Sequence, residues 1–543
     1  MRLLTLYSLS AVVIWAGVIE YDEIITKQNS LSKDYYINRL ANERKLSIEQ
    51  AQNLQNQIFR KAGVVSKSLN KIAPPKPSTG KCQGVNASNI TISSIECQNA
   101  LTTISYSLKL SSQVRAKIAE NLEVLHPQKA RILKILNESN PAQIFAKNMQ
   151  TEQFLAYFRA INAQKQAKQF SIDFDETFLN KLYQTNGFNA VLTELVLERK
   201  LDNFRENFIK ISPNITEKNG AFFLALNAIT LNKDEKATQF FARAEQTYEA
   251  QSQRDNAIFW LYLIKKDKNL LIKLANSTDI NIYSLFAKDY VKSNPFDVYV
   301  PRPKKLKFEG SANINDPFFW EKMNNLVKNM SADEAREFAK QFYANDSIGY
   351  YAFFMQKANG WSRHYYVMPQ SPELENIQDS RKALIYALAR QESRFIPGVV
   401  STSYALGTMQ FMPFLANAIG KKELKIANFD QDDMFKADVA YKFANHHLDY
   451  LEKFLYHPLF IAYAYNGGIG FTKRLITRDD MFRDGKFEPF LSMELVPVRE
   501  TRLYGKKVLA NYIVYNSLMG SNIKISTLLQ TLTQPALTDK FRK

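Results

Sequence analysis

The chain has 543 residues, 45% of them hydrophobic, and its 71 Lys and Arg against 53 Asp and Glu give a formal net charge of +18. At roughly 100–200 residues per domain, this length predicts more than one packed unit with a sizeable core. The basic residues are scattered, and there is no phosphate loop, dinucleotide-binding fingerprint or H-E-x-x-H zinc motif, so the sequence does not support nucleic-acid, nucleotide or zinc-peptidase function. We expect no nucleic-acid partner, no metal and no cofactor.

The N-terminus is predicted to be a signal peptide, residues 1–18. Arg2 gives a small positive start, residues 3–18 are mostly apolar, and the acidic stretch 20–23 ends the segment. Sixteen residues are too few for a membrane-spanning helix and fit the apolar core of a secretory signal. An uncleaved anchor and an ordinary core helix are the alternatives. The prediction is export to the periplasm, with no stable membrane span after cleavage.

The only two cysteines, Cys82 and Cys97, are separated by 14 residues. In an oxidising compartment such a pair is expected to close a disulfide loop, which stabilises a fold by roughly 2–4 kcal/mol. The intervening stretch 83–96 is polar and turn-like, so it gains order from a bridge. The alternative is a pair of free, buried thiols, and the spacing matches no metal site.

Amphipathic helices are predicted almost without interruption from about residue 100 to 292. Gly and Pro are scarce, at 18 each, and apolar residues recur at helical spacing. Two successive segments show this spacing, the first at Phe222, Ala225, Leu226 and Ile229, and the second at Ala237, Phe240, Phe241, Ala244 and Tyr248. Short helices joined by polar turns predict stacked helical hairpins, because one hairpin alone cannot bury its apolar face. An irregular helical bundle is the alternative to this solenoid.

Proline-rich stretches divide the chain into regions. Three prolines fall within residues 73–80, and further clusters occupy 293–305 and 368–372, where a helix cannot continue. We therefore predict an all-α protein with three regions after the signal peptide. They are a helical superhelical domain at 19–292, a helical linker domain at 293–368 and a C-terminal domain at 369–543, which carries the motifs.

The candidate acid is Glu392, near the end of a helix predicted over 380–393. Leu384, Leu388 and Glu392 are four residues apart, which places the carboxyl group on the same stripe as two apolar side chains. Burial raises the pKa of a carboxyl group, and the negative end of the helix dipole acts in the same direction. The Pro-Gly pair at 397–398 is expected to end the helix. This position suits a general acid near neutral pH, although a Glu at a helix end is usually a solvated surface residue.

Three sequence blocks include this position and follow one another along the chain. The first combines Glu392-Ser393, Ser401 and the run Gly407-Thr408-Met409-Gln410-Phe411-Met412-Pro413; the second is Ala464-Tyr465-Asn466-Gly467-Gly468; the third is Glu500-Thr501-Arg502-Leu503-Tyr504. Together they resemble the signature of the soluble lytic murein transglycosylase family. The resemblance covers roughly the last third of the chain.

The resemblance implies a lysozyme-like α domain behind an N-terminal helical superhelix, and an enzyme that cleaves peptidoglycan without water. Glu392 would protonate the glycosidic oxygen between N-acetylmuramic acid and N-acetylglucosamine. It would then act as a base on the muramic 6-hydroxyl, which attacks the anomeric carbon and leaves a 1,6-anhydro end. The substrate's own N-acetyl oxygen would replace the usual second carboxylate. Asp430, Asp432, Asp433 and Asp438 stay open as candidates for a second carboxylate.

Six further residues are expected to contact the sugar chain, three of them in the first block. Ser401 would orient the N-acetyl group, or it would only shape a loop turn. Gln410 would bind sugar hydroxyls or hold Glu392. Met412 would face sugar, or it would pack in the core.

The other three expected contacts lie in the second and third blocks. Tyr465 would hold the carboxyl group of Glu392 through its hydroxyl and pack on a sugar ring. Asn466 would contact the ligand, or it would only cap its helix before two glycines. Glu500 would orient a sugar amide, or it would form an ordinary ion pair with Arg502.

The expected partners are peptidoglycan glycan strands, with cell-wall synthesis proteins as a second class. A net positive charge favours adsorption on an anionic polymer. Two other functions stay open. A lysozyme-type muramidase on the same fold would use water in place of the 6-hydroxyl, and a non-catalytic murein-binding scaffold would recruit partners through the solenoid.

Overall fold

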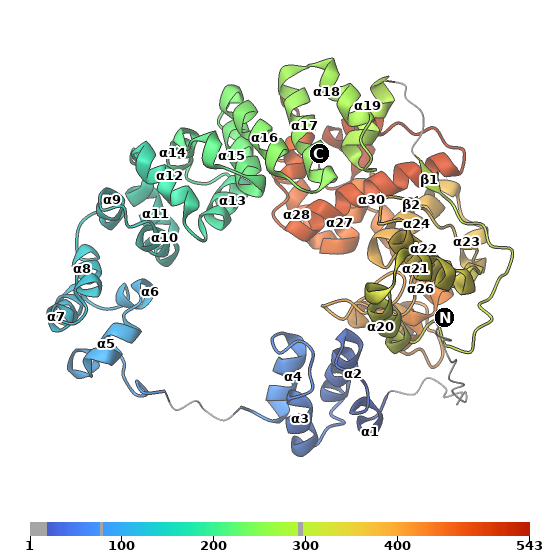
Figure 1. Ribbon diagram of the computed structural model, residues 1–543, viewed down its shortest axis with the longest axis horizontal. Coiled ribbons are helices and arrows are strands. Elements are labelled where there is room, and N and C mark those ends of the chain that lie inside the picture. Colours follow the sequence, from blue (N-terminus) through green and yellow to red (C-terminus); the bar gives the residue numbers. More distant parts are fainter. Residues whose placement is uncertain (1–18, 76–79, 292–296, 543) are drawn as a thin grey trace. The chain divides into compact units, whose positions relative to one another are not determined.

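The computed structural model in Figure 1 describes residues 19–75, 80–291 and 297–542. Nearly all of the regular secondary structure in these residues is helical, which confirms the predicted all-α fold. No helix in these ranges has the length and apolar character that crossing a membrane requires. The predicted signal peptide, residues 1–18, lies outside the described residues.

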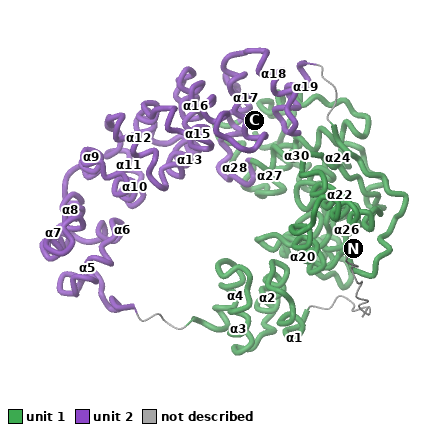
Figure 2. Tube along the Cα trace, in the orientation of Figure 1, with its two compact units in different colours: residues 1–76, 294–481, 503–543 green, residues 77–293, 482–502 purple. Residues whose placement is uncertain are grey.

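Contacts divide the chain into two compact units, which are coloured in Figure 2. Unit 1 consists of residues 1–76, 294–481 and 503–543, and unit 2 consists of residues 77–293 and 482–502. This grouping differs from the predicted boundaries in three places, the first being that the predicted linker domain, 293–368, groups with the C-terminal region. The N-terminal helices group with the C-terminal region, and residues 482–502 group with the predicted solenoid.

Unit 2 contains the helices that follow the first proline-rich stretch. Their bounds are α5 (Ile95–Leu101), α6 (Ile104–Ser107), α7 (Ser112–Leu122), α8 (Pro127–Ile135), α9 (Pro141–Lys147), α10 (Thr151–Ala160), α11 (Ala163–Phe170), α12 (Glu176–Gln184), α13 (Phe188–Glu198), α14 (Asp202–Asn207), α15 (Lys218–Thr230), α16 (Asp234–Thr247), α17 (Gln251–Lys265), α18 (Lys268–Ala275), α19 (Ile282–Val291) and α29 (Phe490–Glu494). Successive helices pack against each other, as α7 does with α8, α15 with α16, and α18 with α19.

The core of unit 2 uses the apolar positions that the helical spacing singles out. Phe222 on α15 and Phe241 on α16 pack edge to face with ring centroids 5.3 Å apart. Trp260 on α17 stacks on Phe241, also at 5.3 Å. All three rings are buried, so each helix covers the apolar stripe of its neighbour.

Residues 482–502 join unit 2 through a half-buried ring and a buried carboxylate. The ring of Phe490 on α29 lies 4.7 Å from that of Phe259. Glu494 accepts a hydrogen bond of 2.9 Å from the Tyr283 hydroxyl. Because these partners lie more than 200 residues away in the sequence, no local pattern predicts the contact.

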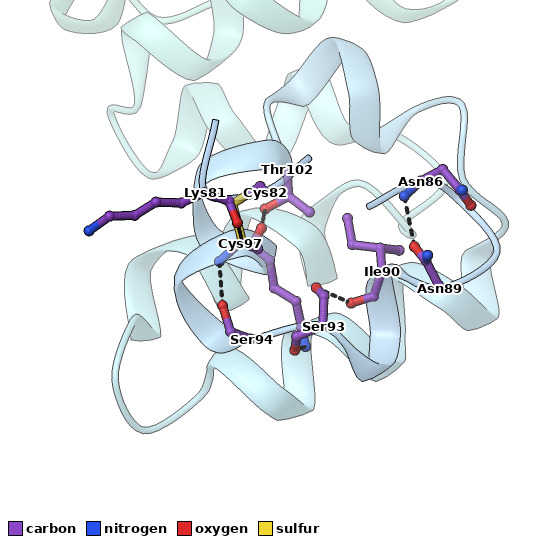
Figure 3. Close-up of a disulfide and its surroundings, with 10 residues drawn as sticks. Lys81, Cys82, Asn86, Asn89, Ile90, Ser93, Ser94, Cys97 and Thr102 are labelled. Carbon is purple, nitrogen blue, oxygen red and sulfur yellow. Dashed lines mark hydrogen bonds between the residues drawn. A yellow bond between two sulfur atoms is a disulfide. The ribbon is translucent and has the colours of Figure 1, made fainter. Parts of the chain in front are cut away.

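Cys82 and Cys97 form a disulfide bond of 2.03 Å (Figure 3). Cys97 lies in the first turn of α5, where Ser94 caps the helix by accepting a hydrogen bond of 3.3 Å from the Cys97 N–H. Ile95 in the same turn packs against a small core made of Ile90, Leu110, Ile118, Ala119, Leu122, Ala130 and Leu133. The bridge therefore adds a covalent constraint to a segment whose own core is small.

Unit 1 contains the remaining helices and the two strands. The helices are α1 (Tyr21–Ile24), α2 (Leu31–Asn42), α3 (Ile48–Gln55), α4 (Val64–Ile72), α20 (Pro317–Leu326), α21 (Ala332–Ala339), α22 (Ile348–Ala358), α23 (Pro372–Glu375), α24 (Asp379–Glu392), α25 (Pro413–Asn417), α26 (Ala437–Glu452), α27 (Pro458–Gly467), α28 (Ile469–Ile476), α31 (Ile525–Gln530), α32 (Pro535–Thr538) and most of α30 (Arg499–Leu518). The strands β1 (Val298–Tyr299) and β2 (His364–Tyr365) pair in parallel.

Helix α24, which carries Glu392, is enclosed in the core of unit 1. Its residues 383–389 are all buried, on every face, as expected for a helix inside a core. The side chain of Asn511 on α30 donates a hydrogen bond of 3.3 Å to the Ala387 carbonyl and accepts one of 2.8 Å from Arg390. These contacts tie the C-terminal half of α24 to α30.

The N-terminal helices join unit 1 through ring and polar contacts. Tyr36 on α2 stacks on Phe318 of α20 with ring centroids 5.8 Å apart. Arg39, also on α2, forms hydrogen bonds with the carboxylate of Asp430. Local sequence patterns can indicate a helix such as α2, but they do not reveal its distant partners.

His457, which caps the start of α27, makes the stability of unit 1 depend on pH. Its Nδ1 accepts a hydrogen bond of 3.0 Å from the Leu459 N–H, so the ring is neutral and Nε2 donates to the Leu528 carbonyl at 3.0 Å. Burial lowers the pKa of His457 from 6.5 to about 4. The unfolded chain therefore takes up a proton at a higher pH than the folded chain does.

We expect this histidine to contribute about 3 kcal/mol to stability above pH 6.5, and to lose that contribution as the pH falls toward 4. Urea unfolding between pH 7 and 4 measures the slope. The matched variant is His457→Asn, because Asn still caps a helix but does not titrate. Parallel pH profiles for the parent and the variant would contradict the prediction.

Candidate active site

Glu392 is the last residue of α24, within one residue of the predicted helix end. It is half-buried, whereas Leu384 and Leu388 on the same stripe are buried. The helix stops because Arg394 and Phe395 take positive φ angles of 56° and 65°, which turn the chain away. Glu392 thus lies at the edge of a core.

The hydroxyl of Tyr504 holds the Glu392 carboxyl group. It donates a hydrogen bond of 2.6 Å to Oε1 of Glu392. Tyr504 lies on α30 and is 4% exposed, so its ring is fixed by packing. A short bond from a fixed hydroxyl orients the carboxyl group.

Sequence reasoning missed Tyr504 and gave its role to Tyr465. The third block contains a single aromatic hydroxyl, that of Tyr504, which was the available signal. The predicted site residue in this block was Glu500 instead. The hydroxyl of Tyr465 instead donates to the Met409 carbonyl at 3.0 Å. The two tyrosines lie on different helices, α27 and α30, and only the packing of these helices decides which hydroxyl meets Glu392.

Tyr465, on α27, still belongs to the surroundings of Glu392. It is half-buried, and burial followed by the charge of Glu392 raises the pKa of Tyr465 well above its usual value. Its ring packs at right angles to Phe411, with centroids 6.0 Å apart. Its hydroxyl bond to Met409 connects α27 to the loop that carries the first block.

That loop runs from 399 to 412 and is folded on itself. Leu406 pairs with both Val400 and Phe411 in antiparallel bridges. Gly407 has a φ of 75°, and a Cβ atom there would lie 1.8 Å from the Met434 carbonyl oxygen, so only glycine fits. The close approach fixes the middle of the loop against the 430–435 turn.

Gln410 and Ser393 hold the loop from inside. The side-chain amide of Gln410 donates to the carbonyls of Val399 and Gly407, at 3.0 and 2.8 Å. The hydroxyl of Ser393, the residue after the acid, donates to the Thr408 carbonyl at 2.8 Å. The amide oxygen of Gln410 is then the part that can meet a sugar hydroxyl, and this contact stays a prediction.

Ser401 shapes the start of the loop. Its Oγ accepts hydrogen bonds from the N–H groups of Ala405, at 2.9 Å, and Ser403, at 3.2 Å. The turn-forming interpretation of this serine therefore describes the structure. The hydroxyl hydrogen can still be donated, so its contact with an N-acetyl group stays a prediction.

The remaining predicted contacts occupy different settings. Met412 is half-buried at the start of α25, whereas Met409 is completely buried. Asn466 is half-buried in the last turn of α27. Glu500 is exposed in the first turn of α30, in the part of that helix that groups with unit 2. The sugar contacts of Met412, Asn466 and Glu500 stay predictions.

The four aspartates considered as a second carboxylate all have structural partners. Asp430 and Asp432 bind Arg39, Asp433 accepts from the N–H of Asp430 and pairs with Lys436, and Asp438 accepts from Ser371. Within the described ranges, no three His, Cys, Asp or Glu side chains gather in a group that could hold a metal ion. The geometry therefore gives no support to a carboxylate pair built from these aspartates.

An aromatic row that sequence reasoning also missed extends from Tyr465. The ring of His447 on α26 lies 5.8 Å from that of Tyr465, and Tyr450 stacks on His447 at 6.0 Å. Burial lowers the pKa of His447 to about 4, so this ring is uncharged near neutral pH. Tyr450 is 43% exposed, which leaves its ring accessible to a ligand. The helical spacing of 447 and 450 was the available signal.

Comparison with known proteins shows which domain family this region resembles. Residues 372–487 match the family model described as the transglycosylase SLT domain. No curated protein matches the chain. The structure of an inactive mutant of the lytic transglycosylase Slt from Pseudomonas aeruginosa is similar, with 14% sequence identity and a TM-score of 0.50. The match covers 91% of this chain and 83% of that protein. The 70 kDa soluble lytic transglycosylase SLT70 from Escherichia coli matches with 15% identity, 93% and 83% coverage and a TM-score of 0.49.

Residues 372–487 thus match the transglycosylase SLT domain, which confirms the family resemblance; the first and second blocks lie in this range, and the third lies beyond it. Glu392, the 399–412 loop and Tyr465 lie inside this domain. Tyr504 lies beyond its end, on the helix that packs against α24.

Proposed function

We propose that this protein is a lytic transglycosylase that cleaves the β-1,4 bond between N-acetylmuramic acid and N-acetylglucosamine in peptidoglycan. The observation that carries the proposal is the setting of Glu392 in the SLT domain. Its carboxyl group ends a buried helix and receives the Tyr504 hydroxyl at 2.6 Å. A single oriented carboxyl group of this kind can deliver and then recover one proton.

The reaction balances without water. Glu392 gives its proton to the bridging oxygen while the bond from that oxygen to the anomeric carbon of muramic acid breaks. The muramic 6-hydroxyl oxygen then bonds to the same carbon, and its proton returns to Glu392. The products are a free 4-hydroxyl on N-acetylglucosamine and a 1,6-anhydro ring, and the enzyme ends in its starting state.

One carboxyl group is enough if the substrate stabilises its own cation. The N-acetyl oxygen of muramic acid is placed to do so, and substrate assistance is a known exception to the carboxylate pair. The engagement of Asp430 and Asp432 with Arg39 supports this mechanism over one with a second acid. Ser401 lies in the loop that would orient the N-acetyl group.

The proposed sugar contacts come from all three blocks. Ser401, Gln410, Met412, Tyr465, Asn466 and Glu500 are the proposed contacts. Aromatic faces pack well on sugar rings, so His447 and Tyr450 extend this proposal beyond Tyr465.

We further propose that the enzyme works in the periplasm. Residues 1–18 have the composition of a signal peptide, and the bond between Cys82 and Cys97 suits an oxidising compartment. Glycan strands are its proposed partner there, with cell-wall synthesis proteins as a second class.

Mass spectrometry of digested murein tests the reaction. The transglycosylase gives 1,6-anhydro ends, which are lighter than reducing ends by one water and resist borohydride. If borohydride reduces every product, the enzyme is a muramidase that uses water. If the full-length protein binds murein and releases no fragment, the scaffold function is favoured instead.

A further inference from the structure

The N-terminal segment 19–75 makes a buried polar contact with the 430–435 turn. The guanidinium of Arg39 donates to both carboxylate oxygens of Asp430, at 2.9 and 2.5 Å, and lies 2.9 Å from Asp432. The Tyr35 hydroxyl donates to Asp432 at 2.5 Å and accepts from Gln431 at 2.6 Å. Tyr35 is 1% and Arg39 is 7% exposed, whereas the side chain of Asp430 is 37% exposed, so the contact is shielded from water on the side of the N-terminal segment.

This turn touches the 399–412 loop and the helix that follows it. The Met434 carbonyl is the group that meets Gly407 so closely that no side chain fits there. The side chain of Gln431, which Tyr35 engages, accepts a hydrogen bond of 2.9 Å from Asn417 at the end of α25. Arg39 and Tyr35 therefore hold the far end of the loop through one intermediate turn.

A second contact reaches the loop directly. Arg60 donates a hydrogen bond of 2.6 Å to the carbonyl of Thr402, next to Ser401. The backbone at Arg60 is itself fixed, because the buried carboxylate of Asp34 accepts from the N–H groups of Phe59 and Arg60 at 2.8 Å each. The segment thus presents Arg60 from a rigid support.

The loop needs such support because its backbone is strained. Tyr404 and Gln410 have positive φ angles of 66° and 52°, which residues other than glycine rarely adopt. Such conformations persist only where the surroundings determine them. Tyr404 is 5% exposed, and its ring lies 6.3 Å from that of Tyr35, so the N-terminal segment covers one of the two strained positions.

We propose that the N-terminal segment 19–75 is a positioning element of the active site, which holds the 399–412 loop in its sugar-binding shape through Arg60, Arg39 and Tyr35. These residues act through the loop and touch no substrate. The proposal rests on the proposed function for its effect on catalysis, but its effect on the loop is independent of any activity.

The test compares Arg60→Ala with Lys61→Ala in the full-length protein. Both side chains are exposed, so neither change should unfold the protein. In Arg60→Ala we expect amide hydrogen exchange in peptides covering 401–412 to rise roughly tenfold, with an unchanged melting temperature. With a soluble murein fragment as substrate, kcat/KM should fall roughly tenfold, because misplaced contacts weaken orientation. Lys61→Ala should match the parent in every measurement.

Arg60→Lys provides the conservative rescue, since a lysine can still donate to the Thr402 carbonyl. We expect it to restore most of the protection of 401–412 and most of kcat/KM. If exchange in 401–412 is the same in Arg60→Ala and the parent, the positioning role is wrong. If the parent cleaves no murein, the proposed function fails, and the exchange comparison still decides the role of the segment.

Discussion

Glu392→Gln is expected to lower murein cleavage by roughly 10²–10⁴-fold, because the amide cannot supply the proton that the leaving oxygen needs. The substitution preserves the shape of the side chain, and the Gln oxygen can still accept the Tyr504 hydroxyl. The fold and the affinity for murein should therefore be retained. Release of soluble muropeptides from purified sacculi measures the cleavage.

Glu375→Gln is the matched control for this change. Glu375 is also the last residue of a helix in the SLT domain, but it is exposed. The Glu375→Gln variant should digest murein at the rate of the parent and melt at the same temperature. If Glu392→Gln digests murein as fast as the parent does, Glu392 is not the acid.

Tyr504→Phe is expected to lower kcat by about 10–100-fold while the protein stays folded. The phenyl ring keeps the packing of a side chain that is 4% exposed, and the change removes only the hydroxyl bonded to Glu392. A hydrogen bond to a charged group contributes about 1.5–3 kcal/mol, which corresponds to this range of rates if the bond orients the acid in the transition state. Steady-state kinetics on a soluble murein fragment gives kcat and KM separately.

Two other tyrosines make the result specific. Tyr515→Phe removes a buried hydroxyl on the same helix, one that donates to the Val367 carbonyl at 3.0 Å, and it should leave kcat nearly unchanged. Tyr465→Phe removes the bond to the Met409 carbonyl and should have an intermediate effect through the loop. Equal losses in the Tyr504 and Tyr515 variants would mean that Tyr504 has only a structural role.

The sequence was informative wherever local rules decide the outcome. The four-residue spacing of Leu384, Leu388 and Glu392 predicts a helix over 380–393, and the structure has it at Asp379–Glu392. Helical periodicity likewise predicts the stacked helices around Phe222 and Phe241. In each case one stretch of chain contains the whole signal, so the tertiary fold does not need to be known.

The sequence was silent wherever a contact joins distant segments. Arg39 and Asp430 are 391 positions apart, and nothing in either neighbourhood marks them as partners. The choice between Tyr504 and Tyr465 as the donor to Glu392 depends on how α27 and α30 pack in the fold. The turn made by Ser401 depends on N–H groups whose direction the residue types alone do not set.

The bridge between Cys82 and Cys97 has a practical consequence for biochemistry. Both of the chain's cysteines lie in unit 2, whereas Glu392 and Tyr504 belong to unit 1. A reducing agent such as dithiothreitol therefore alters a covalent bond in one unit and leaves the groups around Glu392 chemically unchanged. Digestion of long strands and of short fragments, each with and without reductant, therefore tests whether the bridge in unit 2 affects cleavage, without any mutation.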